Sequence, residues 1–259
     1  MGKYGPIIED FYTERSRILS ALAEDQNKHI VMRLIGALAF RTHCQKYGYI
    51  QDKLGRVFTD FDFVAYPKYT KDITRVLTEL GYEEDKQVTQ LFGDKRMIFH
   101  DPSFGRHIDV FYNYLDFCHT INFIGRLEAE EITIPLAELF LEKMQIVQIN
   151  EKDIIDTIML LLEHPFGEGD KETINIKVLV NTLTSDWGWW RTTTGNMKVV
   201  DDRLKMYENL TSEEQQIVHS RLEELRKIID EAPKSVKWKI RSKVGDKVKW
   251  YKDVEELTR

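Results

Sequence analysis

The spacing of hydrophobic residues in the first 115 positions alternates between helical and strand-like. Apolar residues at near-helical spacing over 7–22 predict an amphipathic opening helix. An apolar run over 29–36 ends in Gly36 and is followed by helical composition, which predicts a strand, a turn and a helix centred on this glycine. Later segments are expected to form a helix over 68–80, closed by Gly81, and strands over 55–67, 86–92, 95–100 and 106–113. The order of these elements predicts an α/β fold.

The pattern becomes mostly helical after about residue 130. Pro135 suits the first turn of a helix, and Thr211 with Glu214 has the spacing of a capping box before a long amphipathic segment. We therefore expect two domains, an α/β domain over 1–130 and a helical domain over 131–259.

The composition is that of an ordinary globular protein, with 259 residues and a formal charge of -6. Two cysteines are too few for a disulfide framework or a Cys-only zinc site. The pairs His43–Cys44 and Cys118–His119 leave a mixed zinc site open, although adjacent residues point in different directions. No apolar run approaches the length that spans a bilayer, so we expect a cytoplasmic protein without membrane contact.

Two carboxylates stand in an otherwise apolar predicted strand. Asp60 and Asp62 are two residues apart, so on a strand both side chains leave the same face. A third acid, Asp109, is flanked by apolar residues on another predicted strand that could lie beside the first. Three like charges in a low-dielectric cleft need compensation, and Mg2+ prefers such oxygen ligands. The sequence therefore predicts a magnesium site at these three residues.

Two metal ions held by carboxylates would suit the in-line transfer of a nucleotidyl group. Two alternatives remain open at this point. Asp60 and Asp62 could be cap or loop residues, and Asp109 could form a structural ion pair with Arg106 or His107.

Three segments resemble the nucleotidyltransferase fold of the DNA polymerase β superfamily: RLIGALAFRTHC, GRVFTDFDFV and RHIDVFYN. That family has a strand ending in Gly-Gly or Gly-Ser, a strand with two acids separated by one residue, and a third acid on a later strand. The segment PLAELFLEKMQIVQINEKDIIDTIMLL is similar to a motif of the AbiEii-like abortive-infection toxins. The resemblance covers about residues 30–165 and implies a mixed sheet with flanking helices, followed by a helical C-terminal half.

The resemblance also implies roles for individual residues. Asp60 and Asp62 would bind the metals, and Asp109 would complete the metal site or act as a base. The metal would be Mg2+, with Mn2+ as a substitute. Lys143 would contact the triphosphate and belong to the catalytic residues, and Lys152, Asp153 and Asp156 would lie on a helix facing the cleft. The residues expected at the nucleotide are Gly36, Ala37, Arg56, Thr59, Lys143 and Asp156.

Two features depart from the family pattern. Ala37 stands where a second glycine or a serine is usual, so only backbone contacts to phosphate remain there. The gap from Gly36 to Asp60 is longer than in minimal members of the superfamily. Lys143 could instead be a solvated residue of an amphipathic helix, and Asp153 and Asp156 could simply favour the helix N-terminus.

The C-terminal end has a net positive charge, in contrast to the rest of the chain. Nine Lys and Arg stand against four Asp and Glu from Lys234 to Arg259, a net charge of +5. Lysines alternate with aromatic residues over 234–252, which is typical of a phosphate-binding stripe or of a solvated helix docked by its aromatic residues. The Trp cluster over 187–190 could stack a base, but we favour packing between two units.

These features together predict a cytoplasmic, Mg2+-dependent nucleotidyltransferase that transfers a nucleoside monophosphate from an NTP such as ATP. The resemblance implies a toxin-type enzyme acting on RNA or protein, with tRNA as the natural choice of RNA. The alternatives are an aminoglycoside-type enzyme with a small-molecule acceptor, and an inactive binding module that belongs to a toxin–antitoxin pair and binds an antitoxin protein.

Overall fold

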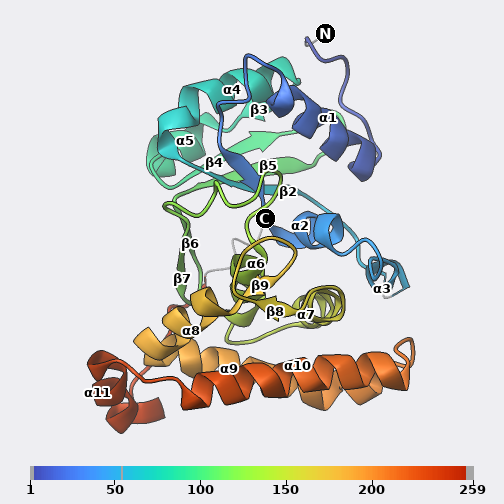
Figure 1. The fold of residues 1–259 in the computed structure, drawn as a ribbon. Helices are drawn as coiled ribbons and strands as arrows, with labels where there is room; N and C mark the ends of the chain where they lie inside the picture. The colour runs from blue at the N-terminus through green and yellow to red at the C-terminus, as the bar shows by residue number, and fades with distance from the viewer. Residues whose placement is uncertain (1–2, 54, 255–259) are drawn as a thin grey trace. The chain divides into compact units, whose positions relative to one another are not determined.

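The computed structural model describes residues 3–53 and 55–254, and the chain divides into two compact units (Figure 1). Unit 1 contains the residues up to 39, together with 57–115 and 122–134. Unit 2 contains residues 40–56, 116–121 and those from 135 onward. Two segments of the first 130 residues therefore belong to the second unit. Residues 255–259 of the basic tail lie outside the described residues.

Unit 1 is built on a five-stranded mixed sheet with the order β1-β2-β5-β4-β3. Strands β2 and β5 are parallel, whereas β1 pairs with β2, and β4 with both β5 and β3, in the antiparallel sense. The two central strands are almost fully buried because their apolar residues face both sides of the sheet. The strands are β1 Met32–Leu34, β2 Phe61–Ala65, β3 Glu83–Glu84, β4 Arg96–His100 and β5 His107–Tyr112.

Helices pack against this sheet in unit 1. Helices α1 (Phe11–Ala23) and α4 (Thr70–Glu79) contact each other and bury apolar residues that include Ile18 and Ile73 (Figure 1). A short 3-10 helix, Pro67–Tyr69, precedes α4. Helix α2 (Gly36–His43) begins directly after β1, as the glycine turn predicts.

Two strand predictions need correction. The strand expected over 55–67 covers only Phe61–Ala65, so Asp60 lies in the loop before β2, as the loop alternative for this residue allowed. The second prediction was wrong altogether. The segment 86–92 forms helix α5 (Lys86–Phe92) instead of a strand. The reason is local, because the Asp85 carboxylate accepts hydrogen bonds from the backbone N–H groups of Gln87 and Val88 and so caps the helix.

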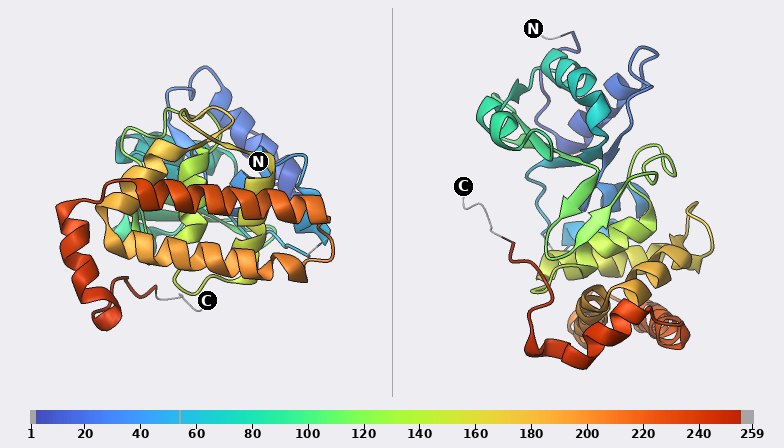
Figure 2. Two further views of the ribbon diagram at one scale, coloured as in Figure 1. Left: turned by 60° about the horizontal axis from the view of Figure 1, so that its bottom comes forward. Right: turned by 90° about the vertical axis from the view of Figure 1, so that its left-hand side faces the viewer.

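Unit 2 is mainly helical. Helices α9 and α10 run side by side in opposite directions, joined by a 3-10 turn (Leu204–Met206) and a short loop (Figure 2). The predicted capping box between Thr211 and Glu214 is confirmed at the start of α10. The helices are α3 Tyr49–Lys53, α6 Leu136–Met144, α7 Glu151–Glu163, α8 Ile176–Ser185, α9 Trp187–Arg203, α10 Ser212–Glu231 and α11 Val236–Val244.

Short strands complete the described chain. Strands β6 (Tyr114–Asp116) and β7 (Thr120–Asn122) form one two-stranded sheet, and β8 (Phe166–Gly167) pairs with β9 (Ile174–Asn175) in another. A last 3-10 turn covers Gly245–Lys247. The aromatic run over 187–190 is part of the continuous helix α9, because the Asp186 side chain caps its N-terminus through the N–H groups of Gly188 and Trp189.

Candidate functional site

The first candidate site lies where the two parallel strands of unit 1 begin. Asp62 on β2 and Asp109 on β5 are direct neighbours across the parallel ladder. Asp60 immediately precedes β2, two residues before Asp62. Since register partners on adjacent strands direct their side chains to the same face, the backbone brings the second and third acids together as the sequence predicts.

Two cations of unit 1 lie against these acids. Arg96 on β4 donates from Nε to Oδ1 of Asp109 at 2.6 Å, and from Nη2 to Oδ2. His107 on β5 contacts Asp60 through its ring Nδ1, while its Nε2 is 3.5 Å from Oδ2 of Asp109. The acids of this site are therefore compensated, at least in part, by protein groups.

The alternative that Asp109 forms an ion pair with Arg106 or His107 was right for one of these two residues. His107 is one of its partners, but Arg106 is not, because Arg106 forms a buried ion pair with Asp101 at 2.8 Å. The main partner, Arg96, could not be inferred from the sequence. Arg96 is paired with Phe111 in the antiparallel ladder, so it reaches Asp109 diagonally across two positions of register.

The ionisation of these groups follows from their contacts. Burial raises the pKa of Asp109, but hydrogen bonds from His107 and Arg96 outweigh it and hold that pKa below its ordinary value. The same balance between burial and the contact with His107 lowers the pKa of Asp60. Hydrogen bonds to Asp109 and Asp60 raise the pKa of His107 to about 9. At pH 7 the site thus combines ionised carboxylates with a charged imidazole and a guanidinium.

Gly36 is required where α2 meets Asp62. Its φ of +67° lies in the left-handed region, and a Cβ atom added there would lie 2.9 Å from Oδ2 of Asp62. The backbone is tied at the same point, because the N–H of Ile35 donates to the carbonyl oxygen of Asp62 at 2.9 Å. Any side chain at position 36 would therefore displace the Asp62 carboxylate.

The remaining predicted nucleotide residues of unit 1 are Ala37 and Thr59. Ala37 is the second residue of α2, and Thr59 is exposed just before the acids. No group of three His, Cys, Asp or Glu side chains that could hold a metal ion occurs among the described residues. The carboxylate oxygens of Asp60 and Asp62 nevertheless have the chemistry that a hard cation prefers.

A second cluster of predicted residues lies in unit 2. Lys143 on α6 is buried, with its Nζ 3.3 Å from Asp156, 3.4 Å from Asp153 and 3.6 Å from Glu142. It also lies over the Phe40 ring, 5.3 Å from the centroid. Burial lowers the pKa of Lys143, but the carboxylates around it outweigh this effect and raise that pKa above its ordinary value. The alternative of a solvated lysine is therefore wrong.

The other members of this cluster centre on Asp156. Arg56 lies 3.8 Å from Oδ2 of Asp156, and Gln51 donates to Oδ1 at 2.8 Å. Gln51 was missed by the sequence analysis, since nothing in its own segment identifies a polar residue that is fully buried. Asp153 also completes a capping box with Asn150, so its capping and clustering roles coexist. Lys152 is exposed and has no ion pair with this cluster in the described structure.

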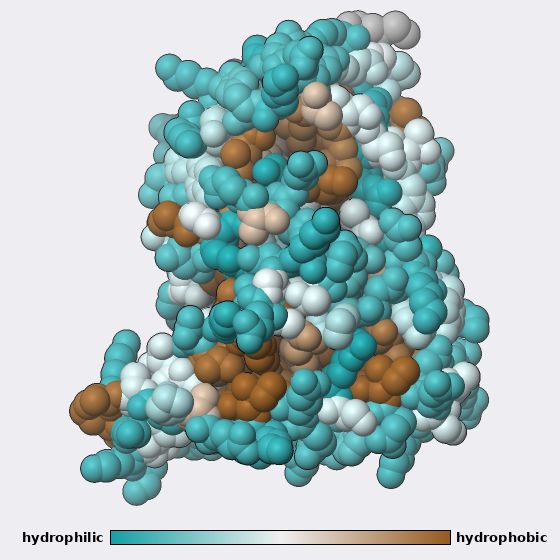
Figure 3. Space-filling model, in the orientation of Figure 1, coloured by the Kyte–Doolittle hydropathy of each residue, from teal (hydrophilic) through white to brown (hydrophobic). Residues whose placement is uncertain are grey.

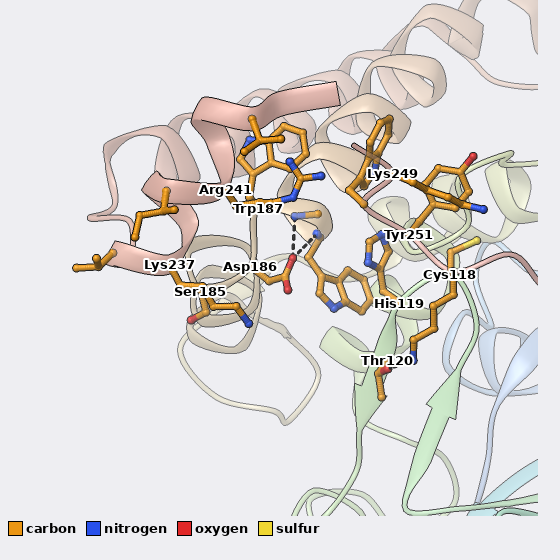
Figure 4. Close-up of a pocket in the computed structure, with 17 residues that line it drawn as sticks. Cys118, His119, Thr120, Ser185, Asp186, Trp187, Lys237, Arg241, Lys249 and Tyr251 are labelled. Atoms are coloured by element: carbon orange, nitrogen blue, oxygen red, sulfur yellow. Dashed lines mark hydrogen bonds between the residues drawn. The ribbon is translucent and has the colours of Figure 1, made fainter. Parts of the chain in front are cut away.

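The Trp cluster and the basic tail line one pocket of unit 2, with a volume of about 930 Å³ (Figure 4). Trp187 and Trp189 are buried in its wall, which agrees with the packing role favoured for them. The Arg241 guanidinium lies over the Trp187 ring at 4.6 Å, and His119 stacks on Trp189. The Trp187 and Trp189 rings and the Arg241 guanidinium therefore already have partners within the chain.

Helix α11 contributes apolar and basic residues to the lining of this pocket. Val236, Ile240 and Val244 are exposed at helical spacing, and hydrophobic surface is visible over α11 at the lower left of Figure 3. The same helix carries Lys237, Lys239, Arg241 and Lys243 and no acidic residue.

Comparisons with known proteins do not assign this chain to a family. The sequence matches no protein-family model, and no curated protein is significantly similar to it. No helix in the described ranges, 3–53 and 55–254, is long and apolar enough to cross a membrane. Inference about function therefore depends on the residues of the two clusters and of the pocket.

Proposed function

We propose that this chain is a Mg2+-dependent nucleotidyltransferase that transfers a nucleoside monophosphate from an NTP to an acceptor. The observation that supports this most strongly is the placement of Asp62 and Asp109 as register partners on adjacent parallel strands, with Asp60 two residues ahead. The contact of Gly36 with Asp62 adds a helix N-terminus to the same place. An acidic group beside a backbone amide turn suits a metal–triphosphate substrate.

Each part of the site has a task in this proposal. Asp60 and Asp62 hold the metal ion, and the backbone N–H groups at Gly36 and Ala37 bind phosphate oxygens. Asp109 either completes the metal site or accepts the proton of the attacking hydroxyl. When bound, Mg2+ activates the attacking oxygen and stabilises the leaving pyrophosphate.

The unit 2 cluster contains two cations that the resemblance assigns to the nucleotide. Lys143 and Arg56 are its cations, and both lie within 4 Å of the Asp156 carboxylate. Asp156 fixes their positions and is itself oriented by Gln51. A lysine acts as a point charge, whereas the planar arginine fork can bind two phosphate oxygens at once.

Isothermal titration of each NTP with Mg2+ tests the proposal. Wild-type protein is expected to bind at least one NTP in a metal-dependent manner, and Asp60→Asn with Asp62→Asn should lose this binding. Asp25→Asn is the control, because Asp25 is an exposed carboxylate whose side chain is 98% accessible. If folded wild-type protein binds no NTP, the enzyme proposal fails. The inactive binding module, favoured by the compensation of Asp109 by Arg96, then becomes the better account.

We propose RNA as the acceptor, bound through the basic segment 234–252. The exposed lysines of α11 have no ion pair within the described part of the chain and are available to phosphates. Binding of unfractionated tRNA should weaken steeply with salt, and the triple variant K237E/K239E/K243E should reduce it at least tenfold. Salt-independent activity on an aminoglycoside, with no tRNA binding, would favour the small-molecule alternative.

A further inference from the structure

The pocket of unit 2 has the size of a small-molecule site. Its volume of about 930 Å³ lies within the range of about 300–1,000 Å³ that such sites occupy. Its lining residues all belong to unit 2 and come mainly from the start of α9, from α11, from the loop between β6 and β7, and from the segment 249–252 (Figure 4). A ligand bound here would therefore contact one compact unit of the chain.

The C-terminal side of the pocket wall is fixed by the rest of unit 2. The backbone N–H of Lys252 donates to the carbonyl oxygen of Cys118 at 3.0 Å, and the indole N–H of Trp250 donates to Oγ1 of Thr192 at 3.0 Å. A Cβ atom added to Gly188 would lie 2.7 Å from the Trp250 carbonyl oxygen, so the two backbones are in close contact. The pocket is thus formed before any ligand binds, which lowers the entropic cost of binding.

The charges on the pocket wall leave positive charge on α11. Among the described lining residues the one acid is Asp186, and its carboxylate is used as the N-cap of α9. Lys249 and Lys252 have acidic partners. Lys237 and Arg241, in contrast, form no ion pair anywhere in the described structure. An anionic group bound beside α11 would therefore meet two cations that no carboxylate contacts directly.

The accessible apolar surface of the pocket is aliphatic. Arg241 covers one face of Trp187, His119 covers one face of Trp189, and both rings are buried. Of the aliphatic lining residues on α11, the side chain at position 236 is 74% exposed and that at position 240 is 63% exposed. An aliphatic chain would cover this surface, whereas a nucleobase stacked on these two tryptophans would need ring faces that are already occupied.

We propose that this pocket binds a long-chain carboxylate, a small molecule with an aliphatic chain and one acidic head group. The chain lies against Val236, Ile240 and Val244, and the head group pairs with Lys237 and Arg241. Burial of aliphatic surface supplies the affinity, and the two cations favour an anion over a neutral molecule of the same shape. The inference does not depend on the proposed transfer reaction, because the lining residues are separate from the acids of unit 1 and from the buried lysine cluster.

Fluorescence titration of the full chain with parinaric acid, a fluorescent long-chain carboxylate, tests the charge in this proposal. Wild-type protein should bind one molecule per chain, and the neutral methyl ester should bind at least about fivefold more weakly. Lys237→Gln should weaken binding of the acid by about two- to fivefold and leave binding of the ester unchanged. The matched control is Lys239→Gln, because Lys239 is an exposed lysine of the same helix that does not line the pocket.

A second variant tests the aliphatic surface. Ile240→Glu places a carboxylate against the bound chain and should weaken binding of both the acid and the ester by more than about tenfold. Met206→Glu is the control, since Met206 is an exposed residue of unit 2 outside the pocket lining. Both changes are at exposed positions, so both variants are expected to fold.

Laurate should displace parinaric acid from wild-type protein. No binding of the acid by folded wild-type protein, equal affinities for acid and ester, or unchanged binding by Ile240→Glu would each overturn the inference. Lys237 also belongs to the segment proposed to bind RNA, so a short single-stranded RNA is the competing ligand. Displacement by this RNA and not by laurate would overturn the inference and assign the pocket to RNA.

Discussion

Replacing Gly36 by alanine should separate the structural and the functional roles of the turn before α2. An alanine in the left-handed region costs about 1–2 kcal/mol of unfolding free energy. Its Cβ atom would also lie 2.9 Å from Oδ2 of Asp62, so the carboxylate must retreat by about 0.5 Å to reach an ordinary contact of 3.4 Å. Metal–ligand distances tolerate about 0.2 Å. We therefore expect Gly36→Ala to remain folded but to bind Mg2+ at least tenfold more weakly.

The matched control is Gly125→Ala. Gly125 has a similar φ of +74°, but nothing lies within 4 Å of the Cβ atom that alanine would add. Urea unfolding should show a similar loss of stability in both variants, while Mg2+ titration should show weaker binding only in Gly36→Ala. Equal Mg2+ affinities in the two variants would refute the reasoning, because the contact with Asp62 would then have no consequence.

Three further predictions concern unit 2. Lys143→Met leaves buried carboxylates without their central cation, so urea unfolding at pH 7 should show that the free energy of unfolding falls by about 3–5 kcal/mol. The control is Lys177→Met, because Lys177 forms an exposed ion pair with Glu168. This variant should change the free energy of unfolding by less than about 0.5 kcal/mol. Burial lowers the pKa of His119 from 6.5 to about 4, so between these pH values the unfolded chain takes up a proton that the folded chain does not. The neutral His119 therefore contributes fully to stability above pH 6.5. This contribution is lost as the pH falls towards 4, by up to about 3 kcal/mol. His119→Gln should flatten that acid limb in urea unfolding at several pH values, and an unchanged limb would contradict the assignment. Thr211→Ala removes one side of a capping box and should lower the free energy of unfolding by about 1 kcal/mol, measured by thermal unfolding. No change would mean that α10 is stabilised by packing alone.

The hydrophobic pattern was a good guide to the central strands and a poor one at the edge of the sheet. Strands β2 and β5 have long apolar runs because they are buried on both faces, and such runs are visible in the sequence. The segment 86–92 has strand-like residues but no buried residue in the structure, so its apolar pattern does not determine its conformation. The hydrogen bonds of the Asp85 side chain favour the helix instead, and Asp85 can form them only because the preceding strand ends before it.

The acids of the candidate site could be predicted, but their partners could not. Asp60, Asp62 and Asp109 stand out because a charge in an apolar strand is costly, which is a property of the local sequence. The identity of Arg96 as a partner depends on the register of β4 against β5, and the burial of Lys143 depends on how α6 packs on α7. Both are non-local facts that one sequence does not specify.

Compensation by Arg96 and His107 has a consequence for the stability of the metal-free chain. If protein cations balance the acids, a metal ion is needed for substrate binding and not for folding. A chelator such as EDTA should then leave the urea midpoint of the wild-type protein unchanged in metal-free buffer. Adding Mg2+ at ten times its Kd should stabilise the chain by only about 1.4 kcal/mol, through mass action alone.

Arg96→Gln changes that expectation, because Asp109 loses the charge that matches it. This variant should be less stable than wild type in EDTA and should recover a larger share of its stability on adding Mg2+ or Mn2+ than wild type gains. Arg96→Lys should lie between the two, since one ammonium replaces a bidentate fork. If EDTA instead unfolds the wild-type chain, the acids depend on a metal for their compensation and not on Arg96 and His107.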